Sequence, residues 1–266
     1  MPPSVIQKLA LDQELLNSVR LIRAGFGQLQ NLDGGNDFYH LPLLILASGF
    51  ERFMKVLLCL RALEVHGEFS GGKPFRTGRE GHNLDLLLER IKEDCFSKRY
   101  LEETPVASED MSFLKSAELI RFINVLSQFG QSARYYSFDV LLGKTPKTED
   151  PESLWQHLEA EIVQQRDDLM KLIGASGGSE KIHHEVATHV VATLERFVRA
   201  LSRLFTIGGI GNDAKRFVGY ISVFLHLADE ELGSTAYDPC GRLFCGQQQK
   251  HAQHTANAAR CAPNHT

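Results

Sequence analysis

The stretch from Leu41 to His66, LPLLILASGFERFMKVLLCLRALEVH, constrains the fold more than any other part of the chain. On a helix with about 3.6 residues per turn, its apolar residues cover most of the circumference. A surface helix needs an apolar stripe only about 100° wide, so this helix must be covered by several neighbours. Only the line of Ile45, Arg52, Cys59 and His66 is expected to face solvent. The stretch therefore predicts the central helix of an all-α bundle.

Glu51 and Lys55 interrupt the apolar surface of this predicted helix at an interval of four residues. In this order the two side chains form a favourable ion pair on one helix face. Leucines lie one turn above and below them, so we expect both side chains to be partly buried, with charged ends that reach toward another helix. Two interpretations stay open: an ordinary intrahelical ion pair, and a pair that fixes the bundle or binds a partner.

Further helices are expected on both sides of the central one, which makes about seven helices in all. Helical spacing of apolar residues, together with capping residues and turn signals, places them at residues 5–29, 84–91, 108–134, 151–173, 179–205 and 213–232. Alternating apolar runs are few, so strands are not expected. The helices divide into a bundle over residues 1–142 and a second helical section over residues 151–232. These two sections can form one domain or two.

The remaining residues, 233–266, lose the helical periodicity and are poor in large aliphatic side chains. Such a segment cannot bury enough apolar surface to offset the entropy of ordering it, so we predict a disordered tail. The tail holds enough side chains to ligate zinc: Cys240, Cys245, His251, His254, Cys261 and His265. Their spacing matches no compact zinc pattern. We therefore predict no metal site and no cofactor.

Composition narrows the class of protein. The chain is 43% hydrophobic and 23% charged, which is typical of globular proteins, and its formal charge of -4 argues against a general polyanion binder. No apolar run approaches the length of about 18 residues that a transmembrane helix needs. Asp12 and Glu14 stand where a signal peptide needs its apolar centre, and five cysteines fit free thiols in a reducing compartment. We expect a cytoplasmic protein that does not bind a membrane.

A second group of residues looks like part of a zinc protease motif. In HHEVATH, His184 and His189 are five residues apart, about 140° around a helix, whereas the protease motif needs His-Glu-x-x-His. The motif is therefore absent. Glu185 and His189 are four residues apart, and we expect them to pair on the surface.

Three short motifs follow one another over residues 38–142: GFERFMK in the apolar helix, GHNLDLLL after a glycine-rich loop, and ARYY at the end of a long helix. In this order they resemble helical proteins of the HEPN superfamily and its abortive-infection-type relatives. The resemblance implies a helical bundle, often dimeric, that binds RNA or nucleotides, in some members cuts RNA, and acts in stress or phage defence. The residues it singles out for binding are Glu51, Lys55, His82, Arg134 and Tyr135.

Ribonucleases of this superfamily carry Arg and, a few residues later, His near the start of a late helix. Arg61 and His66, in RALEVH, match the spacing but end the central helix and lie about 140° apart on it. A chance match or helix-end capping is favoured over a catalytic pair.

Two functions stay open at this stage. The first is a non-catalytic helical interaction or sensing module, with a protein partner or self-association. The alternative is an RNA-binding protein or metal-independent endoribonuclease that uses either Arg61 and His66 or the group Lys55, His82, Arg134 and Tyr135. Its phosphate contacts would come from the basic side chains near Lys73, Arg76, Arg79 and Arg134.

Overall fold

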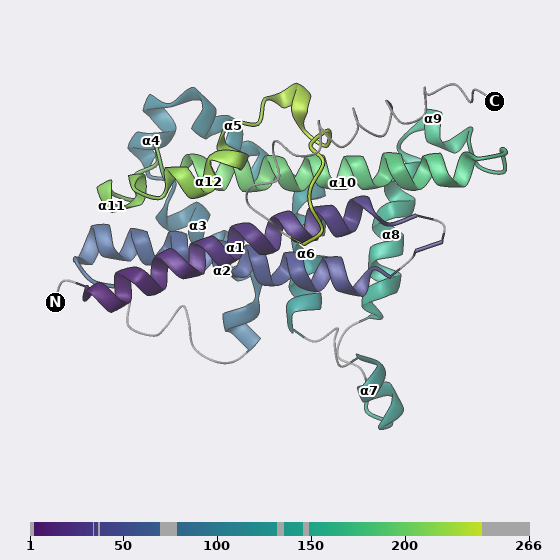
Figure 1. Cartoon of the computed structure of the whole chain (residues 1–266), viewed down its shortest axis with the longest axis horizontal. Helices are drawn as coiled ribbons and strands as arrows, with labels where there is room; N and C mark the ends of the chain where they lie inside the picture. Colours follow the sequence, from purple (N-terminus) through teal and green to yellow (C-terminus); the bar gives the residue numbers. More distant parts are fainter. Residues whose placement is uncertain are drawn as a thin grey trace, which may run out of the picture.

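The computed structural model describes residues 3–33, 35–36, 38–69, 79–131, 136–145 and 149–240 (Figure 1). Within these ranges the chain forms helices and no strand, apart from one isolated bridge between Asp33 and Asn36. The predicted all-α class is therefore confirmed. No helix in the described ranges is long and apolar enough to cross a membrane.

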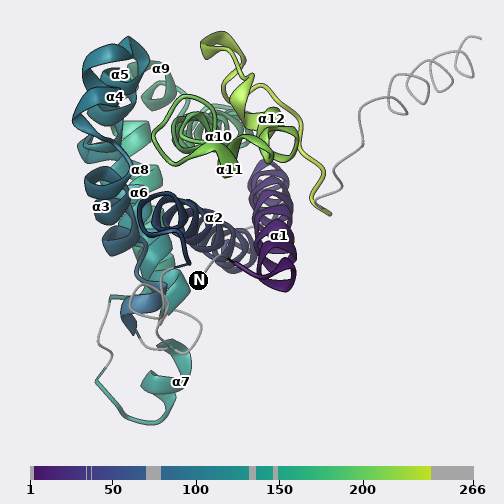
Figure 2. The same ribbon diagram turned by 90° about the vertical axis from the view of Figure 1, so that its left-hand side faces the viewer.

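Three long helices form the body of the molecule: α1 (Val5–Gln30), α2 (His40–His66) and α10 (Gly178–Arg203). Both views show them side by side (Figures 1 and 2). Ser4 caps α1 with its hydroxyl, and Gly67 ends α2 in the left-handed conformation at φ 72°. The expected starts and ends of these three helices agree with the structure to within about two residues.

The helix α2 is central, as its sequence predicts. It packs against α1, against α3 (Leu84–Asp94) and against α6 (Ala117–Gln131), and residues from most of its circumference are buried. The rings of Phe50 and Phe197 lie 5.2 Å apart and join α2 to α10. On the predicted solvent line, Arg52 keeps 41% of its side chain exposed.

Shorter helices cover the face of α2 that lies opposite α1 (Figure 2). Of these, α3 and α6 pack directly on α2. The helices α4 (Lys98–Glu103), α5 (Pro105–Leu114) and α8 (Pro151–Gln164) lie around them, and α5 and α8 pack against α6 and α10. The remaining described elements are η1 (Arg79–His82), α7 (Tyr136–Leu141), α9 (Asp167–Met170), α11 (Asn212–Lys215), α12 (Val218–Leu225) and η3 (Asp229–Glu231).

Three of the predicted helices are broken. The expected helix over 108–134 is two helices, because the chain turns at Lys115 and the Ser116 hydroxyl accepts a hydrogen bond from Leu119 N at 3.3 Å. The expected helix over 151–173 stops at Gln164, and α9 follows it after a turn. The expected helix over 213–232 is divided into α11, α12 and η3.

The predicted start of the disordered tail is wrong, because residues 233–237 pack on the bundle. Tyr237 keeps only 7% of its surface exposed, and its ring lies 5.1 Å from that of Phe26. Its hydroxyl donates a hydrogen bond of 2.5 Å to Glu195, and its backbone N–H donates to Gln30 at 3.0 Å. Residues 241–266, which hold most of the histidines and cysteines considered above, lie outside the described residues.

The two helical sections share one core. Trp155 of α8 is buried and contacts both Phe122 of α6 and Tyr39 at the start of α2, with ring centroids 6.1 and 6.3 Å apart. The buried apolar side chains of both sections form a single cluster. The described helices therefore form one domain, and only α7 stands apart from the bundle (Figures 1 and 2).

Candidate functional site

The first candidate site joins Glu51 and Lys55 of α2 to His82 at the end of η1. The Glu51 carboxylate accepts a hydrogen bond from Lys55 Nζ at 2.6 Å and lies 2.9 Å from His82 Nδ1. The Lys55 and Glu51 side chains are only 19% and 15% exposed, which confirms that the pair is partly buried. The structure therefore brings together three of the five residues expected to bind a ligand. Arg134 and Tyr135, the other two, lie outside the described residues.

The geometry of this group explains its effect on the fold. Glu51 has its donors on two elements, one on its own helix and one on η1. A half-buried carboxylate is stable only when such donors replace the water it loses. Glu51 therefore ties the segment that precedes α3 to the central helix.

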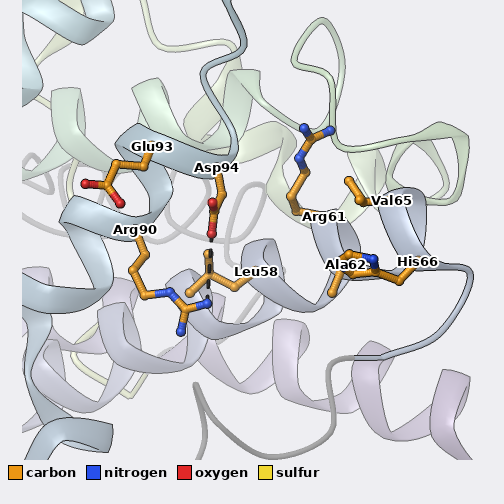
Figure 3. A pocket seen from close by; sticks show the side chains of 8 residues that line it. All are labelled: Leu58, Arg61, Ala62, Val65, His66, Arg90, Glu93 and Asp94. Carbon is orange, nitrogen blue, oxygen red and sulfur yellow. Dashed lines mark ion pairs between the residues drawn. The ribbon is translucent and has the colours of Figure 1, made fainter.

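The second candidate site is a groove between the last turns of α2 and α3, with a volume of about 290 Å³ (Figure 3). Leu58, Ala62 and Val65 supply its apolar surface, and all three come from α2. Charged or titratable side chains surround them: Arg61, His66, Arg90, Glu93 and Asp94. Both residues of the sequence-predicted Arg and His pair thus line the same groove.

The Arg61 and His66 side chains do not converge within this groove. Arg61 Nη1 donates a hydrogen bond of 2.7 Å to the carbonyl oxygen of Gly209, in the turn after α10. Figure 3 shows the guanidinium directed away from the His66 ring, which lies beside Ala62. A general acid or base must reach the reacting group together with its partner, and this arrangement does not provide that.

The facing wall of the groove comes from α3 and was not anticipated. Arg90 and Asp94 form an ion pair at 3.9 Å, and Glu93 lies beside them (Figure 3). Their spacing along an amphipathic helix shows that they share its polar face. The sequence does not show which neighbour that face meets, and this is why the three residues were missed. Arg61 lies opposite them, so the positive charges of Arg61 and Arg90 balance the negative charges of Glu93 and Asp94.

The cysteines near the groove are unsuited to nucleophilic chemistry. Burial raises the pKa of Cys95 to about 12 and that of Cys59 to about 11. A thiol is a nucleophile only as the thiolate, so both side chains stay protonated and unreactive at neutral pH.

The histidines of α10 form other contacts than expected. His189 Nε2 lies 2.6 Å from Glu118 of α6, and Glu185 accepts a hydrogen bond from Arg166 at 3.0 Å. The predicted pair of Glu185 and His189 is therefore wrong, because neighbouring helices offer both side chains closer partners. Within the described ranges no group of histidine, cysteine or carboxylate side chains is arranged to hold a metal ion.

Comparison of the chain with family models, with curated proteins and with solved structures finds no match.

Proposed function

We propose that this chain is a non-catalytic helical interaction module of the cytosol, which binds a protein partner in the groove between α2 and α3. The observation that carries the proposal is the lining of that groove, an apolar floor bordered by charged side chains of both signs. Interfaces between proteins combine an apolar centre with a polar rim in the same way. The titratable side chains of the groove do not converge on one point, which favours binding over catalysis.

The size and charge of the groove define the partner. A volume of about 290 Å³ is at the lower end of the range of ligand pockets, roughly 300–1,000 Å³, and fits one or two side chains. Leu58, Ala62 and Val65 favour an apolar side chain there. Arg90 and Asp94 would pair with charged residues on either side of it. The expected partner is thus a peptide segment in which an apolar residue stands between an acidic and a basic one.

Selection from a displayed peptide library tests this proposal. Peptides that bind the wild-type protein should bind the Ala62→Glu variant at least about tenfold more weakly, because the new carboxylate occupies the apolar floor. The matched control is Ala10→Glu, which places the same side chain on an exposed position of α1 and should leave binding unchanged. Peptides that bind all three proteins equally, or a selection that enriches none, would contradict the proposal.

A second function is favoured by one observation, the presence of Arg61 and His66 in the same groove. As an HEPN-like protein, the chain would bind RNA there or cut it without a metal ion. Incubation with mixed RNA in EDTA, across a salt series, separates the outcomes. Cleavage that is lost in both Arg61→Ala and His66→Ala, but kept in the exposed control Arg99→Ala, would establish a ribonuclease. Binding that weakens steeply with salt, without cleavage, would indicate an RNA-binding module. If RNA is neither cleaved nor bound, the partner-binding proposal stands.

A further inference from the structure

Residues 233–240, which we call the strap, cross the bundle from α10 to α1 (Figure 1). Tyr237 is the only buried side chain of the strap, whereas Ser234, Ala236 and Cys240 are exposed. A single buried aromatic residue among exposed neighbours is the arrangement of an anchor residue in a protein interface. The strap therefore lies on the bundle in the manner of a bound peptide.

The bundle contacts both the ring and the hydroxyl of Tyr237. The ring lies 5.1 Å from that of Phe26 on α1, and the hydroxyl donates a hydrogen bond of 2.5 Å to Glu195, which is fully buried on α10. A site that accepts a hydrogen bond from a hydroxyl rejects an analogue without one, because a buried acceptor then loses its donor. The contact therefore distinguishes tyrosine from phenylalanine.

Gln30, in the last turn of α1, holds the backbone of the strap. Its Oε1 atom accepts a hydrogen bond from Tyr237 N–H at 3.0 Å, and its Nε2 atom donates one of 2.7 Å to the carbonyl oxygen of Thr235. Hydrogen bonds to the main chain give affinity for an extended peptide, whereas contacts with its side chains give specificity. Gln30 and Glu195 supply one of each.

The surface of α1 leaves room for the strap at Gly27. A Cβ atom on this residue would lie 2.6 Å from the nitrogen of Pro239 and 2.8 Å from its Cα atom, so the two backbones are in direct contact. Glycine weakens the interior of a helix, and it is useful where another backbone must approach closely. Gly27 thus shapes this face of α1 for a closely bound segment.

The pair of Tyr237 and Glu195 is an inefficient way to cover apolar surface. Burying a carboxylate is unfavourable even when donors replace its water, and an apolar side chain in place of Glu195 would avoid this penalty. What the pair does provide is a preference for one kind of side chain. The pair therefore favours recognition of a particular segment over simple covering of Phe26.

We propose that this surface of α1 and α10 is a recognition site for an extended segment of a partner protein, and that the strap occupies it as an intramolecular competitor. The segment that fits carries a tyrosine and, two residues later, a proline that packs on Gly27, as Tyr237 and Pro239 do. The site shares no lining residue with the groove between α2 and α3, so it is a second binding surface.

The attachment of the strap determines how strongly it competes. A short tether gives an attached segment an effective concentration in the millimolar range. A partner segment therefore binds only those molecules from which the strap has detached, and its apparent affinity falls in proportion to their fraction.

A fluorescent peptide with the sequence of residues 234–239, STAYDP, tests the proposal on the full chain. It should bind the variant Tyr237→Ala at least about tenfold more tightly than the wild type, because the wild-type strap competes for the site. Phenylalanine in place of the tyrosine of the peptide should weaken its binding at least about fivefold. Adding Gln30→Ala to the variant should also weaken binding, whereas the matched control Gln28→Ala, on the other side of α1, should not.

Hydrogen exchange in the wild-type protein supplies a readout that needs no variant. The Tyr237 amide is protected by Gln30 only while the strap is bound, so millimolar unlabelled STAYDP should speed its exchange. The amide of Leu194, in the core of α10, should not change. This measurement decides the matter if circular dichroism shows that Tyr237→Ala does not fold.

Three results would overturn the proposal. They are a folded Tyr237→Ala protein that does not bind the peptide, equal binding of the tyrosine and phenylalanine peptides, and an exchange rate of the Tyr237 amide that the peptide does not change. The groove between α2 and α3 is unaltered in every variant, so peptide binding to the groove is judged separately.

Discussion

At the scale of single residues, the clearest consequence concerns Glu51. Replacing it with Ala removes the acceptor of Lys55 and of His82 and leaves a half-buried ammonium group without its partner. We expect a loss of about 1–2 kcal/mol in the free energy of unfolding, reduced from the cost of a fully buried pair because water still reaches both side chains. The midpoint of urea denaturation measures it.

A matched control for Glu51 is Glu103, which accepts a hydrogen bond from Arg99 at 3.0 Å on the same helix. The Glu103 and Arg99 side chains are 61% and 83% exposed. Glu103→Ala should therefore lower the free energy of unfolding by less than about 0.5 kcal/mol. Equal effects of the two substitutions would show that the burial of Glu51 has no energetic consequence.

Glu195 gives the molecule a predictable response to pH. The side chain is buried on α10, and this desolvation raises the pKa of its carboxyl despite hydrogen bonds from Gly233 N–H and the Tyr237 hydroxyl and the nearby charge of Arg199. A group whose pKa is higher in the folded state stabilises the fold below its unfolded pKa, and this contribution is lost as pH rises through the folded pKa. Stability attributable to Glu195 should therefore fall from acidic toward neutral pH.

The variant Glu195→Gln isolates this contribution, because its amide does not titrate. The difference in melting temperature between wild type and variant, measured from about pH 4 to pH 8, should shift in favour of the variant as pH rises. A difference that stays constant over this range, or that shifts in favour of the wild type, would contradict the assignment.

Residue contacts were predictable from the sequence only where they were local. The burial of Glu51 and Lys55 follows from leucines one turn away on the same helix. The contact of Glu51 with His82 joins residues 31 positions apart, across a glycine-rich stretch of sequence without periodicity, and the bond from Arg61 to Gly209 joins residues 148 positions apart. No local pattern encodes such partners.

At the scale of helices, the sequence predicted which segments are helical and where each helix begins better than where each helix ends. Asp150 before Pro151 and Ser4 before α1 are strong start signals, and both helices begin there. The break between α5 and α6 was missed because apolar residues recur at helical spacing on both sides of it. Lys115 and Ser116 include neither glycine nor proline, so only the packing of the two helices shows the turn.

The contact between α1 and α2 depends on glycine. A Cβ atom at Gly49 would lie 3.0 Å from the backbone nitrogen of Ile22 and 2.9 Å from its Cγ1 atom. Gly49→Ala should therefore separate the two helices and destabilise the protein by about 1–3 kcal/mol. In α12, a Cβ atom at Gly219 meets nothing within 4 Å, so Gly219→Ala should stabilise by roughly 0.5–1 kcal/mol. Thermal melts of both variants would test these opposite signs, and a stable Gly49→Ala protein would show that α1 can shift.

At the scale of the whole molecule, the glycine-rich stretch 174–179 does not divide the chain into two domains. Gly174 and Gly177 adopt left-handed conformations, at φ 79° and 69°, and form a turn that returns the chain into α10. Such turns and true linkers share a composition, so the sequence could not distinguish them. The core that spans both sides of the turn makes the distinction.

The last segment of the described chain, residues 233–240, completes this core and should be needed for stability. It runs so close to α1 that a Cβ atom on Gly27 would lie 2.6 Å from the nitrogen of Pro239. Ending the chain after Leu232 removes the buried Tyr237 ring and leaves Glu195 without its donors at Gly233 and Tyr237. Loss of a buried aromatic costs about 3–5 kcal/mol, so the melting temperature should fall by roughly 6–20 °C. Ending the chain after Cys240 keeps these contacts, and its melting temperature should match that of the full chain.

The variant Tyr237→Phe removes only the hydroxyl, with a loss of about 1–3 kcal/mol in the free energy of unfolding. Its melting temperature should lie between those of the two truncated proteins. Equal melting temperatures for the two truncations would show that residues 233–240 add no stability and that the tail begins at Gly233 after all.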